Sequence, residues 1–88
     1  MIETTMQMEQ ADLMIAIFGA FDENIKLIER ELGVSVVSRA TELKISGDPE
    51  AVGVAERVFA ALLEMARRGE AVSTQTVQYV IGLAREGR

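Results

Sequence analysis

The sequence predicts an α+β fold in which a three-stranded antiparallel sheet is covered on one face by helices. Polar and apolar residues alternate at residues 2–8 and again at 42–46, which is typical of strands with one buried face. Elsewhere the apolar residues recur at helical spacing, and Gly or Asp stands at most of the junctions. The predicted order is strand, helix, helix, strand, strand, helix, followed by one additional C-terminal helix.

The chain begins with a predicted strand that leads into a short helix. Four inward-facing positions of the strand alternate with Glu, Thr and Gln: Ile2, Thr4, Met6 and Met8. In residues 13–18 the apolar side chains have the i, i+1, i+4 spacing of a helix. Gly19 should end this helix, because glycine tolerates a positive φ.

Asp22 is the predicted N-cap of the second helix. Its carboxylate can accept hydrogen bonds from the free N–H groups of the first helical turn. The buried stripe of this helix consists of Ile25, Ile28 and Leu32. Gly33 should end the helix directly before a β-branched run, so a tight Gly-x-x-Asp corner joins two helices that lead into a strand.

A hairpin is predicted after the second helix. Its strands are residues 34–38 and 42–46, and residues 39–41 form the turn between them. The alternation in the second of these strands places Leu43 and Ile45 toward the core.

The longest predicted helix begins at Pro49, with Asp48 as its N-cap. Its apolar stripe consists of Val52, Ala55, Phe59, Leu62 and Ala66. The helix should end near Arg68, before Gly69. Arg67 and Arg68 could contact phosphate, but favourable interaction with the negative end of the helix dipole is the preferred interpretation.

A final helix is predicted from the N-cap Ser73 to the stop at Gly87. Its buried stripe consists of Val77, Val80, Ile81 and Ala84. Tyr79 and Leu83 lie away from this stripe, either as edge contacts or as contacts to a neighbouring domain. We therefore divide the chain into a core domain, residues 1–69, and an additional C-terminal helix, residues 70–88.

Composition restricts the function classes. The 88 residues include no Cys and no His, which removes thiol nucleophiles, disulfides, thiolate metal sites and the usual neutral-pH base. The net charge of −5 has the wrong sign for strong, unaided nucleic-acid binding. No apolar run reaches the roughly 18 residues of a membrane span, and no signal peptide is evident. We expect a cytoplasmic protein without a membrane partner.

Catalytic motifs are not found in the sequence. The only two lysines, Lys26 and Lys44, are followed by Leu and Ile, so the chain has no Gly-x-x-x-x-Gly-Lys-[Ser/Thr] phosphate loop. Neither a His-x-x-His spacing nor a Cys pair offers a metal site. We expect no catalytic residue, metal or cofactor in this chain.

The corner at residues 19–22 and its flanking helices resemble a degenerate KH module, a single-strand RNA reader whose GXXG loop clamps the nucleic-acid backbone. The predicted element order is that of the type I KH fold. The run Phe-Gly-Ala-Phe-Asp-Glu-Asn-Ile-Lys-Leu-Ile-Glu at residues 18–29, with Leu-Gly-Val at 32–34 and Ile-Ser-Gly-Asp at 45–48, more closely resembles the N-terminal domain of PhoH-family proteins. This similarity spans nearly the whole chain.

The PhoH resemblance implies a place in a larger protein. The family consists of phosphate-starvation-inducible P-loop ATPases, and their nucleotide motifs lie downstream of this domain. The chain would then be a non-catalytic N-terminal accessory domain, with ATP and Mg bound by the absent ATPase domain, its expected partner. The family is also placed in RNA metabolism, which makes RNA a candidate partner, and self-association is a further expectation.

Two functions stay open at this point. In the preferred one, the module positions the ATPase domain or mediates assembly, Asp22 only caps a helix, and Lys26 and Arg30 pair with nearby carboxylates. In the alternative, the loop binds single-stranded RNA, with Phe21 as a stacking face. The candidate RNA-contacting residues are Gly19, Ala20, Phe21, Asp22, Lys26, Arg39 and Lys44.

Charge at the loop favours the first function. The Asp22 carboxylate would occupy the helix N-terminus and repel a phosphate there by about 1 kcal/mol. Replacing Asp22 with Gly should, if Asp22 caps the helix, lower stability by a few tenths of a kcal/mol. A basic stripe beside Gly19 would favour RNA binding, whereas an apolar patch on the free sheet face or on the last helix would favour the structural function.

Overall fold

The structure, a computed structural model, describes residues 1–8, 11–19, 22–39 and 41–87. The predicted α+β class and element order are confirmed, with three strands and four helices in the described part of the chain. The elements are β1 (Ile2–Gln7), α1 (Ala11–Phe18), α2 (Glu23–Leu32), β2 (Ser35–Arg39), β3 (Glu42–Gly47), α3 (Pro49–Arg67) and α4 (Thr74–Arg85).

The sheet has the order β1-β3-β2, and both outer strands are antiparallel to β3. Ile45 of β3 lies between Thr4 of β1 and Val36 of β2, and the side chains of these three residues face the helices. Leu43 and Ile45 are fully buried, as predicted. The opposite face of the sheet is free and mostly polar, and it carries Glu3, Thr5, Gln7, Ser35, Val37, Arg39, Glu42, Lys44 and Ser46.

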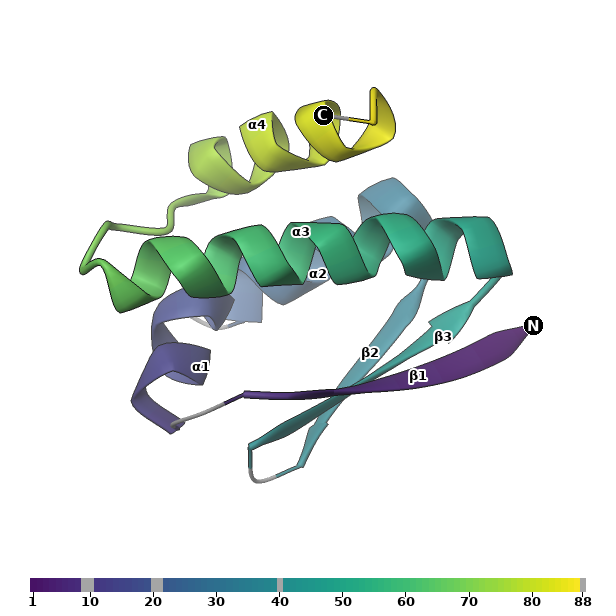
Figure 1. Cartoon of the computed structure of the whole chain (residues 1–88), viewed down its shortest axis with the longest axis horizontal. Coiled ribbons are helices and arrows are strands. Elements are labelled where there is room, and N and C mark those ends of the chain that lie inside the picture. Colours follow the sequence, from purple (N-terminus) through teal and green to yellow (C-terminus); the bar gives the residue numbers. More distant parts are fainter. Residues whose placement is uncertain (9–10, 20–21, 40, 88) are drawn as a thin grey trace.

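The helices cover the other face of the sheet, and α3 lies between the strands and α4 (Figure 1). The predicted stripe of α3 is buried at four positions and half-buried at Ala66. The predicted stripe of α4 is buried as well, and its residues belong to the same core as Phe59 and Ile28. Thus α4 packs on α3 and α2 as part of one core, while the division at residue 69 stays a prediction.

Glycine ends the helices where the sequence predicted. Gly19 follows α1 with a φ of 79°, and Gly33 follows α2 with a φ of 68° and donates its N–H to the Glu29 carbonyl at 2.9 Å. After α3, Gly69 donates to the Ala66 carbonyl and the next residue, Glu70, donates to the Met65 carbonyl, both at 3.0 Å. This pair of bonds is a Schellman motif, which satisfies two carbonyls at the helix end.

The three predicted N-caps differ in what their side chains do. Ser73 precedes α4 and accepts a hydrogen bond from the Thr76 N–H at 3.3 Å. Asp22 and Asp48 stand at the N-cap positions of α2 and α3, but neither side chain makes the expected capping hydrogen bond. At Asp22 the reason is the backbone, which is left-handed with a φ of 57°, whereas side-chain capping normally uses an extended N-cap residue.

No helix in the described part of the chain is both long enough and apolar enough to cross a membrane.

Candidate functional site

The corner between α1 and α2 is the predicted reading loop. Both of its described ends, Gly19 and Asp22, have left-handed backbone, with φ values of 79° and 57°. Gly19 is also tightly surrounded, because a Cβ atom there would lie 3.0 Å from Nδ2 of Asn24. Ala20 and Phe21, predicted as loop floor and stacking face, lie outside the described residues.

A small pocket of about 70 Å³ opens beside this corner. Its walls come from the end of α1, the start of α2 and the outer strand β2, and they are Phe18, Asp22, Ile25, Val36 and Ser38. The only charged side chain among them is the Asp22 carboxylate. The pocket can therefore accept a small apolar or neutral group, but its charge opposes a phosphate.

The predicted basic contacts do not converge on this pocket. Lys26 lines a different groove, between α2 and α4. Arg39 lies opposite Glu42 on the free face of the sheet. Lys44 lies on the same face, half-buried, with Thr5 on one side and Val37 on the other. The structure therefore separates the basic candidates from the loop, and no basic stripe runs beside Gly19 in the described residues.

The groove between α2 and α4 is the larger of these two concavities, about 390 Å³. It is lined by Glu23, Lys26, Leu27, Arg30, Thr74 and Gln78. Lys26 and Arg30 were expected to pair with nearby carboxylates, and that expectation is wrong: in the part of the chain that the structure describes, neither forms an ion pair. Leu27 is the buried floor of the groove.

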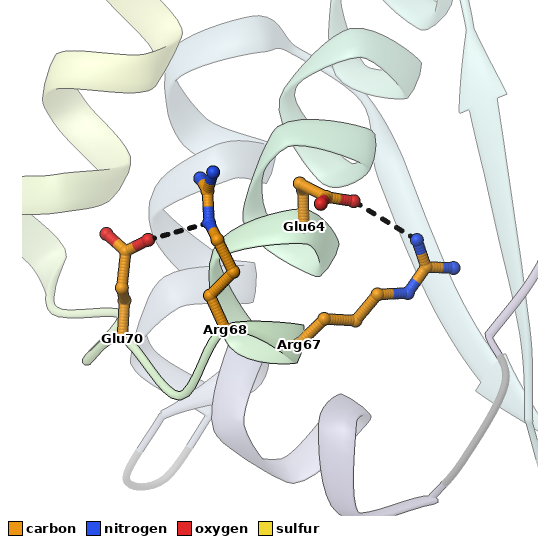
Figure 2. Close-up of polar contacts among 4 residues, drawn as sticks. All are labelled: Glu64, Arg67, Arg68 and Glu70. Atoms are coloured by element: carbon orange, nitrogen blue, oxygen red, sulfur yellow. Dashed lines mark hydrogen bonds and ion pairs between the residues drawn. The ribbon is translucent and has the colours of Figure 1, made fainter.

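Arg67 and Arg68, at the end of α3, contact carboxylates. Figure 2 shows Arg67 directed at Glu64 and Arg68 directed at Glu70, with nitrogen–oxygen distances of 3.1 and 2.9 Å. All four side chains are at least 40% exposed, so each pair should contribute about 0–1 kcal/mol. Carboxylates thus engage both arginines, and their interaction with the helix dipole stays a prediction.

Sequence reasoning missed Asn24, which is fully buried in the first turn of α2. Its Nδ2 donates to the Ile17 carbonyl at 2.8 Å and to the Val72 carbonyl at 3.0 Å. It thereby joins the end of α1 to the segment before α4, while its Oδ1 has no hydrogen-bond partner. The sequence offered one hint: Asn24 stands beside the apolar stripe of a short amphipathic helix. A polar residue at such a position is usually exposed to solvent, so its burial was not expected.

Among the described residues, few large apolar side chains are exposed on the two surfaces where an assembly patch was expected, the free sheet face and α4. Val37, 52% exposed, is the only large apolar side chain on the free sheet face. On α4 the aromatic ring of Tyr79 is 68% exposed, and Leu83 is half-buried. No group of three or more Asp or Glu residues within the described ranges is arranged to hold a metal ion.

Comparison with known proteins gives a consistent result. The chain is 30% identical over 80 residues to a PhoH-like protein of Bacillus subtilis, covering 91% of this chain and 25% of that protein. It is 28% identical over 72 residues to PhoH-like proteins of Mycobacterium tuberculosis and Mycobacterium leprae, covering 82% of this chain and 20% and 21% of those proteins. No family model and no solved structure matches. The chain is thus homologous to PhoH-like proteins over a segment that makes up a fifth to a quarter of their length.

Proposed function

We propose that this chain is a non-catalytic, N-terminal accessory domain of a PhoH-like protein, which positions an ATPase domain or mediates assembly. The homology supports this proposal, because the matched segment is a small part of each relative. By the resemblance of the sequence, the nucleotide motifs, and with them ATP and Mg, belong to the part of the protein outside this chain. A KH-like origin of the module is part of the proposal.

The charge of the loop pocket is the observation on which the choice depends. A KH loop binds because backbone amides and a helix N-terminus approach phosphates closely. Here the Asp22 carboxylate lines the pocket at that helix N-terminus, and none of the described residues that line the pocket is basic. The alternative is that the loop binds single-stranded RNA. One observation favours it: the left-handed backbone at Gly19 and Asp22 makes the sharp corner that such a loop needs.

The exposed ring of Tyr79 is the best candidate for a contact with the rest of the protein. Aromatic side chains are enriched at interfaces, and this one lies on the outer side of α4, away from the buried stripe. Removing an exposed side chain should change stability by less than about 0.5 kcal/mol. A contact with a neighbouring domain can therefore be tested here without unfolding the module.

A domain exchange in the Bacillus subtilis relative tests the proposal. Three proteins are compared: the whole protein, a deletion of the matched segment, and a chimaera in which this chain replaces that segment. We expect the deletion to keep ATP affinity but to change the number of subunits per particle, measured by sedimentation equilibrium, or the rate of ATP hydrolysis, and the chimaera to restore the original value. Tyr79→Ser in the chimaera should reduce the restoration, whereas Val37→Ser, on the free sheet face, should not.

The proposal fails if the deletion leaves both the number of subunits per particle and the rate of ATP hydrolysis unchanged. The loop alternative would be supported instead if the 88-residue chain binds single-stranded RNA and Asp22→Asn, which removes the acidic charge from the pocket, raises the affinity.

A further inference from the structure

Lys26 and Arg30, both on α2, differ from the basic residues of α3 and α4 because they lack a partner in the described part of the chain. Arg57 donates to the Ala84 carbonyl at 3.2 Å, and Arg85 donates to the Glu31 carbonyl. Arg67 and Arg68 pair with carboxylates. In the groove between α2 and α4, two basic side chains that lack a partner among the described residues share one concavity.

The spacing of the two cations carries an energetic cost. Residues four apart lie one above the other on a helix face, and like charges at that spacing repel and destabilise the helix. Both side chains are exposed, so solvent moderates this repulsion. An anion held between them would remove the repulsion and add two charge-assisted hydrogen bonds.

The opposite wall of the groove offers neutral polar groups. Thr74, the first residue of α4, has a hydroxyl, and Gln78, one turn later, has an amide. Asn24 holds this wall in place, because its Nδ2 bonds the Val72 carbonyl just before α4. The two walls of the groove are therefore held at a fixed distance before any ligand binds.

From these contacts we infer that the groove between α2 and α4 binds adjacent phosphate groups through Lys26 and Arg30. Its volume of about 390 Å³ is within the range of ligand sites. None of the described residues that line it is aromatic, so they offer a nucleobase no stacking partner, and the recognition inferred here is of the phosphates. Two sources present such groups, the backbone of a single-stranded polynucleotide and a nucleoside triphosphate. The site does not depend on the accessory role proposed above.

Binding should be weak and salt-sensitive. The net charge of −5 opposes any polyanion, and Glu23 offsets one of the two cations. If a single strand contacts both cations, the slope of log affinity against log salt should be about −1.4. Between about 20 and 200 mM NaCl, affinity would then fall roughly 25-fold.

The experiment titrates the 88-residue chain with a fluorescent oligouridylate and, separately, with ATP, each at low and at high salt. Lys26→Gln and Arg30→Gln are compared with Arg39→Gln and Lys44→Gln, which change the net charge equally but lie on the free face of the sheet. For the parent chain, we expect the affinity for oligouridylate to fall roughly 25-fold between low and high salt. In each single groove variant this fall should be about fivefold, and in the double groove variant it should be absent. The two sheet-face variants should behave like the parent chain.

The two ligands identify the source of the phosphates. Binding of either one that is lost in the groove variants supports the inference. It is overturned if neither ligand binds at low salt, or if the groove variants bind as the parent does. An equal loss in the groove and sheet-face variants also overturns it, because that result would mean a general charge effect. Circular dichroism of each variant verifies that the fold is intact.

Discussion

Replacing Asp22 with Gly should stabilise the chain slightly, which reverses the expectation drawn from the sequence. The left-handed backbone at Asp22 costs an L-residue about 1–2 kcal/mol, and somewhat less for Asp. Glycine avoids that cost but loses about 0.5–1 kcal/mol more backbone entropy on folding. No capping hydrogen bond is lost, because the Asp22 side chain makes none. The net gain should be about 0.5 kcal/mol.

The negative charge of Asp22 requires its own control. A carboxylate at a helix N-terminus stabilises the helix by about 0.3–1 kcal/mol at low ionic strength, and salt screens this effect. Asp22→Asn removes the charge but keeps a side chain that tolerates left-handed backbone. Comparing the Gly and Asn variants therefore isolates the backbone contribution.

Urea unfolding at high salt, followed by circular dichroism, measures the difference. With a slope of about 1 kcal/mol per M for a chain of this size, a gain of 0.5 kcal/mol raises the midpoint by about 0.5 M. The corresponding rise in melting temperature is about 2–4 °C. If the Gly variant is less stable than the Asn variant, relief of the left-handed backbone does not outweigh the entropy cost of glycine, and the backbone argument is wrong.

Three further substitutions test contacts around the corner and the sheet edge. Asn24→Ala should lower the free energy of unfolding by about 2–3 kcal/mol in urea unfolding, because two backbone carbonyls lose their donor; a loss below 1 kcal/mol would show that water replaces the amide. Gly19→Ala should cost at least about 1 kcal/mol, since the new Cβ is strained and crowds Asn24; an unchanged melting temperature would contradict the tight corner. Glu29→Ala should lower the free energy of unfolding by about 1 kcal/mol and speed hydrogen exchange of the Val36 amide about fivefold, because the Glu29 carboxylate accepts from that N–H at 2.9 Å. Equal exchange rates in the variant and the parent chain would exclude the contact.

Element boundaries were predictable because they depend on local backbone demands. Gly33 and Gly69 adopt the left-handed backbone that ends a helix, and Ser73 has the extended backbone of an N-cap. The capping prediction for Asp22 was wrong, and the reason is again the local backbone conformation. Capping preferences assume an extended residue, whereas the chain leaving α1 makes Asp22 left-handed.

The grouping of the site residues was only partly predictable. Lys44 was kept as a candidate RNA contact of the loop, although it stands between two residues predicted to face the core. Strand alternation alone would have put it on the free face, where the structure has it. By contrast, the groove that Lys26 lines depends on where α4 docks, and the buried Asn24 donates to the carbonyl of a residue 48 positions away. Sequence periodicity does not contain such long-range contacts.

Backbone shape and charge act independently at the corner, and this bears on what the module can do. Asp22 adopts a backbone conformation that glycine would favour, so the sharp turn is present without a second glycine. Close approach of a phosphate, however, also requires a surface that does not repel its negative charge. The Asp22 carboxylate does repel it. The neighbouring positions on α2 face in different directions: Ile25 lines the loop pocket, while Lys26 lines the groove toward α4. One helix thus supports two concavities of opposite charge, and a preference for anions follows the groove rather than the corner.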